Sequence, residues 1–191
     1  YKPSVELLSF DMDALPNAVD LSAESIPSVH FDDLDGVIER DEDGLYFWES
    51  LEHMEVSMPA AQAVQPTDFY KDSFVAVVTN TGETVLTSET SFGGALLTEN
   101  ADGEVDRNPE IFILEAFDSA NDFYQETGDI LGANDGIING FVDYSFDTYR
   151  VRTDDIITVT SENQNEREVT SLESNGHQLT VATYNVRNMS V

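Results

Sequence analysis

The stretch SFVAVVT, residues 73–79, decides the fold class, because its β-branched and aromatic residues are typical of a buried strand. The turn Asn80-Thr81-Gly82-Glu83 follows it and predicts a hairpin into residues 84–87. Farther along, YSFDTYRVR at 144–152 alternates with the period of two that strands have. Further strands are expected at 56–64, 111–114, 128–143 (as strand, turn, strand), 156–160 and 178–186. The sequence therefore predicts an all-β fold with little helix, limited to one or two turns within 45–54.

This order of strands suits a five-stranded closed barrel of the OB type, because a long first strand is followed by a hairpin, a loop-rich crossing and a second hairpin. A β-sandwich is the main competitor, and spacing alone does not separate the two. The chain starts at Tyr1 rather than Met, so we interpret it as a fragment of a larger protein. The expected parts are 1–44, an additional N-terminal β segment that either finishes a preceding barrel or packs on this one; 45–160, the barrel; 161–177, a linker; and 178–191, one further strand.

Acidity is the strongest compositional signal. Asp and Glu total 38 against 8 Lys plus Arg, a formal net charge of −30. Such a field repels phosphate backbones and anionic membrane surfaces, so no membrane partner is expected. We favour a solubilising acidic coat over a reservoir of divalent-ion sites. The chain has no cysteine, no apolar run of membrane-helix length and no signal peptide.

No catalytic constellation is visible in the sequence. The three histidines, His30, His53 and His177, are far apart and lack partners at zinc-ligand spacing. There is no Gly-x-Ser-x-Gly elbow and no glycine-rich phosphate loop with a lysine. We therefore expect no active site within the chain itself, and no metal site.

Four acidic clusters that end in glycine invite a calcium test. They lie at 32–36, 41–44, 100–103 and 134–136. With Gly44 at the glycine position of an EF-hand, Ser50 stands where the final bidentate Glu is required, and the other clusters fail at the first ligand. Acidic turns are the favoured interpretation, and an irregular calcium site is the alternative.

A nucleic-acid interface on an OB barrel would use aromatic rings for stacking and basic residues for the backbone. The candidates are Tyr144, Phe146 and Tyr149 with Arg150 and Arg152.

The competing interpretation is structural: the aromatic side chains fill the barrel and the arginines form ion pairs. The acidic partners proposed for these pairs are Asp147, Asp154 or Asp155. With so few cations in the chain, this second interpretation is favoured.

Three stretches, which occur in the same order along the chain, resemble one family. DGLYFWESLEHM at 43–54 resembles the DGIDFYESLEGM segment of large secreted bacterial nucleases, and GDILGANDGIINGFVDYSFDTYR at 128–150 resembles their GDV…GVLDYSFGNYK hairpin. LTVATYNV at 179–186 resembles the opening strand of the endonuclease/exonuclease/phosphatase superfamily. The chain departs from these patterns at His53 and Asp147, where glycine is usual, and at Arg187, where Glu often stands.

The resemblance implies an OB-fold-like region that precedes a metal-dependent phosphodiesterase domain. It assigns Asn185 a part in positioning metal and phosphate, while the metal-binding Glu and the catalytic His and Asp would lie beyond Val191. A divalent ion needs several converging oxygen ligands and a base to activate water, so one Asn is insufficient. The fragment is therefore expected to be an inactive accessory domain, which spaces or orients the catalytic domain.

For the parent, the resemblance implies Mg or Ca as cofactor, the downstream catalytic domain as partner, DNA or RNA as contacts through the parent, and an extracellular or periplasmic location. Two alternatives remain: a nucleic-acid-binding OB module that presents substrate, and a calcium-stabilised extracellular β domain. The strand at 179–186 belongs to a sheet that is missing here, so it should be disordered or pair at an edge.

Overall fold

A computed structural model describes residues 17–29, 37, 39–99, 105 and 107–163 of the chain. The predicted final strand, Asn185, His30 and His177 lie outside the described residues. The acidic clusters at 32–36 and 100–103 also fall outside them.

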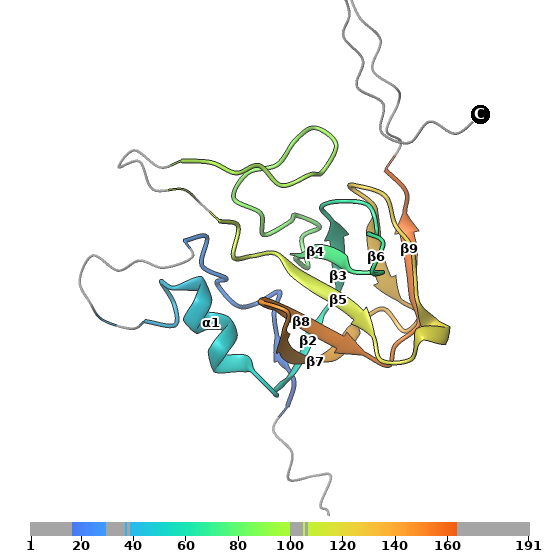
Figure 1. Cartoon of the computed structure of the whole chain (residues 1–191), viewed down its shortest axis with the longest axis horizontal. Coiled ribbons are helices and arrows are strands. Elements are labelled where there is room, and N and C mark those ends of the chain that lie inside the picture. The colour runs from blue at the N-terminus through green and yellow to red at the C-terminus, as the bar shows by residue number, and fades with distance from the viewer. Residues whose placement is uncertain (1–16, 30–36, 38, 100–104, 106, 164–191) are drawn as a thin grey trace, which may run out of the picture.

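One β-sheet dominates the described part of the chain (Figure 1). Its strands are β1 (Val19–Asp20), β2 (Glu55–Met58), β3 (Ala60–Ala63), β4 (Ser73–Val78), β5 (Phe112–Ala116), β6 (Ile130–Ala133), β7 (Ile138–Ser145), β8 (Thr148–Thr153) and β9 (Ile157–Ser161). The helices are α1 (Gly44–Leu51) and the 3-10 turn η2 (Ser119–Asn121). The all-β prediction with little helix is confirmed, although the sheet has nine strands rather than five.

The predicted long first strand is divided in two at Pro59. Proline cannot donate to a ladder, so β2 ends before it and β3 begins after it. β2 pairs with β7, whereas β3 pairs with β4 and β6. The ladder β2-β7-β8-β5-β4-β3 therefore begins and ends on one stretch, 55–63, as a five-strand barrel with a bent first strand would require. Closure of an OB-type barrel stays a prediction.

The predicted hairpin after residue 79 is only partly present. The turn forms, with Thr79 N donating to Glu83 O at 2.8 Å. The prediction of a strand at 84–87 is wrong. Val78 and Thr84 form only an isolated bridge, and Val85 N donates to Val77 O. A long connection then leads from the sheet to β5. Its described residues up to 99 are drawn in green in the upper part of Figure 1.

The second hairpin, β7 to β8, confirms the period-two pattern. Tyr144 lies opposite Tyr149, and Phe146 and Asp147 make the connection. Both turn residues have positive φ, 52° and 60°, as a two-residue type I′ turn requires. An L-residue in this region is strained, so the turn forms against a local cost.

Replacing Asp147 by glycine is expected to stabilise the domain by about 0.5–1 kcal/mol, because glycine removes the left-handed strain at some cost in chain entropy. The check is the urea midpoint by circular dichroism at unchanged slope. Asp135→Gly is the matched control, since Asp135 is not among the residues with positive φ and should lose stability. Equal changes in the two variants would contradict the argument.

Helix α1 lies beside β8, β2 and β7 (Figure 1). Its buried face carries Phe47, Trp48 and Leu51, and the Trp48 ring stacks on Tyr149 of β8 with centroids 6.1 Å apart. After Leu51 the chain leaves the helix, and His53 has φ 64°, the left-handed conformation that glycine favours just after a helix. The His53 amide donates to Val142 O at 2.8 Å, which joins the helix end to β7.

Candidate binding site

The two candidate arginines lie side by side on β8, on the face away from α1. Side chains alternate along a strand, so Tyr149 and Val151 are buried towards the core while Arg150 and Arg152 point to the other side. Parallel pairing places Glu115 of β5 opposite Arg152. This face of the sheet therefore carries cations and carboxylates in adjacent rows.

Arg150 is held by two carboxylates that come from different elements. Its Nη1 donates to Asp72 Oδ1 at 2.9 Å and to Glu115 Oε2 at 3.2 Å. Burial lowers the pKa of Arg150, but the hydrogen bond and charge of Asp72, with those of Glu115, outweigh it and raise the pKa above its usual value. The guanidinium lies 5.7 Å from the centre of the Phe146 ring. Only 6% of the residue is exposed, so Arg150 forms the floor of the site.

Arg152 has a similar but more open environment. Its Nε lies 3.5 Å from Glu115 Oε2, and its Nη1 lies 3.7 Å from Asp143 Oδ2. The Phe117 ring covers the guanidinium at 4.9 Å. Each arginine thus has an aromatic ring on it and a pair of carboxylates beside it.

The arginines do form ion pairs, as the structural interpretation predicted, but not with the predicted partners. Their contacts are to Asp72, Glu115 and Asp143 rather than to Asp147, Asp154 or Asp155. The expected partners were chosen because they are near in sequence. The folded chain instead places carboxylates beside these arginines that are as much as 78 residues away in the sequence.

A hollow of about 570 Å³ lies above Arg150. Tyr70 and Phe146 line it with rings that are 80% and 91% exposed, and Asp72, Glu115 and Arg150 supply its polar lining. It contains flat apolar surfaces together with hydrogen-bond donors and acceptors. That combination is typical of a binding site.

The three candidate aromatic residues do not share one surface. Phe146 lies at the hollow with Arg150, as predicted for a stacking residue. Tyr149 is buried against Trp48, and its hydroxyl donates to Glu49 Oε2 at 2.8 Å. Tyr144 contacts Tyr149 with ring centroids 4.8 Å apart. Tyr149, and Tyr144 with it, thus belong to the side of the sheet that faces α1.

Alkaline unfolding should report on Tyr149. Burial, followed by its hydrogen bond to Glu49, raises the pKa of Tyr149 well above that of an unfolded tyrosine, about 10. The neutral phenol is thus favoured in the folded state, so its contribution to stability is complete below about pH 10 and is lost as the pH rises through the folded pKa. We expect the melting temperature to fall more steeply above this pH in the wild type than in Tyr149→Phe. Parallel slopes would contradict the assignment, and Tyr124→Phe, at an exposed tyrosine, is the control.

Sequence reasoning missed the residues that complete the hollow, Tyr70, Asp72 and Glu115. One signal was available in the sequence. Phe69 and Tyr70 are adjacent aromatic residues in a polar segment between two strands, where they do not contribute to the core. Their exposed fractions are 93% and 80%. Glu115 gave no signal, because it differs in no local respect from other acidic residues of the chain.

Metal binding finds no support among residues 17–29, 39–99 and 107–163. No three acidic or histidine side chains come together there as ligands of one ion would. Nothing in the described part of the chain can therefore be assigned to the Mg or Ca of the predicted parent. The helices described here are also too short or too polar for any of them to cross a membrane.

The fold and the site together define the class of protein. It is an acidic all-β domain with a hollow that is lined by aromatic rings and by an arginine in ion pairs with two carboxylates. A family model described as a domain of unknown function, DUF8508, matches residues 14–178, and the chain belongs to this family. No curated protein and no solved structure matches the chain.

Proposed function

We propose that the chain is a non-catalytic accessory domain of an exported, metal-dependent phosphodiesterase, a nuclease or phosphatase, and that it spaces or orients a catalytic domain that follows it. The observation that carries the proposal is the backbone at His53 and Asp147. Both have left-handed φ, 64° and 60°, and both stand where the resembling nuclease segments have glycine. Left-handed φ at a non-glycine residue is uncommon, so agreement at two positions favours a shared local structure.

The end of the family match supports one boundary of the proposed division, the one before the catalytic domain. The match ends at residue 178, and the segment LTVATYNV, which resembles the opening strand of the catalytic superfamily, begins at 179. The last strand of the sheet, β9, ends earlier, at Ser161. The proposed linker, 161–177, begins at the last residue of β9 and ends before this segment.

The ion pairs favour this function over a nucleic-acid-binding module. Arg150 and Arg152 are the cations that such a module would use, and both already contact carboxylates. A phosphate bound to these arginines would lie close to Asp72, Glu115 and Asp143, within a chain of net charge −30, so binding would be opposed by like charge.

The first test of the proposal is the nucleotide sequence of the gene. The reading frame beyond the codon for Val191 should encode a metal-ligating Glu and the catalytic His and Asp of the superfamily. The 191-residue chain should release no product from plasmid DNA, RNA or p-nitrophenyl phosphate with Mg or Ca, whereas the extended chain should. An extended frame without these residues, or EDTA-sensitive hydrolysis by the short chain, would overturn the proposal.

Export has a separate test. An antiserum should detect the protein in the medium or in the periplasm.

The nucleic-acid alternative has its own test. Anisotropy of labelled single- and double-stranded DNA should stay flat at low salt, with and without Ca. Saturable binding that weakens with salt, and that is lost in the Arg150→Ala, Arg152→Ala double variant, would replace the spacer function by substrate presentation.

A further inference from the structure

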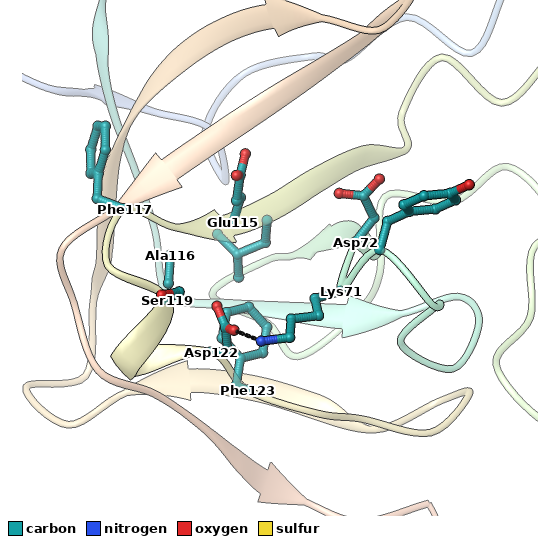
Figure 2. A pocket seen from close by; sticks show the side chains of 10 residues that line it. Lys71, Asp72, Glu115, Ala116, Phe117, Ser119, Asp122 and Phe123 are labelled. Atoms are coloured by element: carbon teal, nitrogen blue, oxygen red, sulfur yellow. Dashed lines mark hydrogen bonds and ion pairs between the residues drawn. The ribbon is translucent and has the colours of Figure 1, made fainter.

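The hollow above Arg150 shares lining residues with a second hollow, and the second shares one with a third. A neighbouring hollow of about 220 Å³ shares Tyr70, Asp72 and Glu115 with it (Figure 2). A third, of about 300 Å³, shares Phe117 with the second. We call this row of three hollows the aromatic groove.

Aromatic rings recur along the groove. The rings that line it and remain at least 44% exposed are Tyr70, Phe117, Phe141 and Phe146. Large apolar side chains gathered in one concave surface are unusual on a monomer and mark interaction sites. Because these rings are distributed over three hollows, an extended ligand would contact more of them than a single small molecule.

Between the rings, hydrogen-bonding groups of both kinds are available. Arg150 uses Nη1 for both of its carboxylates, and its Nη2 forms no hydrogen bond or ion pair within the described part of the chain. Asp72 and Glu115 offer further acceptor positions, since a carboxylate can accept about four hydrogen bonds. Arg152 and Asp143 repeat the pattern at the third hollow. Such a surface suits hydroxyl groups, which donate and accept at once.

Charge decides against an anionic ligand. The two arginines of the groove contact three carboxylates, Asp72, Glu115 and Asp143. Lys71 adds no free cation, because its ammonium group pairs with Asp122, as the dashed line in Figure 2 shows. A phosphodiester or uronate chain would therefore meet a net negative surface, whereas a neutral chain would not.

We propose that the aromatic groove binds a neutral oligosaccharide. Sugar rings pack their apolar faces on Tyr70, Phe146 and Phe117. Their hydroxyls bond to the arginines and carboxylates between these rings. This binding goes beyond the accessory function proposed above, and would attach the parent protein to a polysaccharide-rich surface.

The experiment is native affinity electrophoresis of the 191-residue chain through gels that contain one soluble polysaccharide each. The neutral set is hydroxyethyl cellulose, xyloglucan, laminarin, galactomannan and dextran; alginate and oligothymidylate serve as anionic probes. At least one neutral polysaccharide should retard the chain, and raising NaCl from about 0.1 to about 1 M should leave the retardation unchanged, because no ion pair with the ligand is broken. Titration calorimetry with oligosaccharides from the retarding polymer gives the affinity.

Variants locate the binding. Phe146→Ala and Tyr70→Ala should each weaken it about tenfold or more, since each removes one stacking face. Phe69→Ala is the control for Phe146→Ala, because Phe69 is 93% exposed and Phe146 is 91% exposed, but Phe69 lines none of the three hollows. Circular dichroism establishes that the variants are folded. The proposal fails if no neutral polysaccharide retards the chain, if only the anionic probes do, or if Phe69→Ala has the same effect as Phe146→Ala.

Discussion

Replacing Trp48 by alanine is expected to destabilise the domain by about 3–5 kcal/mol, the range for removal of a buried large aromatic side chain. Trp48 is 2% exposed, contacts Phe47, Phe112 and Tyr149, and donates from Nε1 to Pro109 O at 2.7 Å. The substitution removes the packing of the Trp48 ring between α1 and the sheet and leaves the Pro109 carbonyl without this donor. Urea unfolding followed by far-ultraviolet circular dichroism measures the loss.

Two further variants divide this effect. Trp48→Phe keeps most of the packing but loses the hydrogen bond, so it should cost about 1–3 kcal/mol. Phe69→Ala removes a ring that is 93% exposed and should stay within about 0.5 kcal/mol of the wild type. A loss in Trp48→Ala no larger than in Phe69→Ala would show that α1 does not belong to the cooperative core.

Gly128→Ala is the second large effect that we expect, a loss of about 2–5 kcal/mol. Gly128 has φ 84°, where an L-residue is strained by about 1–2 kcal/mol. A Cβ there would also lie 2.4 Å from Phe92 O and 2.0 Å from Asn163 Nδ2. The amide side chain can move, but the Phe92 carbonyl belongs to the backbone, so overpacking adds about 1–3 kcal/mol.

Gly82 offers a control with the same backbone angle. Its φ is also 84°, but a Cβ there would meet nothing within 4 Å. Gly82→Ala should therefore cost only the conformational part, about 1–2 kcal/mol. If the two alanine variants lose the same stability by urea unfolding, the close approach at Gly128 has no energetic weight.

The sequence predicted the elements whose signals are local. SFVAVVT contains β4, the helix predicted within 45–54 overlaps α1, and the alternating segment contributes to the hairpin of β7 and β8. These succeed because side-chain period and turn chemistry act over a few residues. The strand expected at 84–87 failed because its composition permits a strand but its surroundings provide pairing at a single bridge.

The candidate site was predicted only in part, for a related reason. Phe146 and Arg150 lie together at the hollow, whereas Tyr149 turns to the opposite side and packs on Trp48. Alternation along β8 was visible in the sequence, but not which face would be covered by α1. Tyr70 was missed because its segment meets β8 only in the folded chain.

By itself, the sequence determined the β-rich architecture, the acidic surface and the position of the short helix, since these depend on composition and on periods of two to four residues. Only the tertiary structure decided what the arginines do. Parallel pairing of β5 with β8 places Glu115 beside Arg150 and Arg152, and the end of the segment before β4 adds Asp72. Register between strands far apart in the chain depends on the packing of the whole core, and no local pattern encodes it.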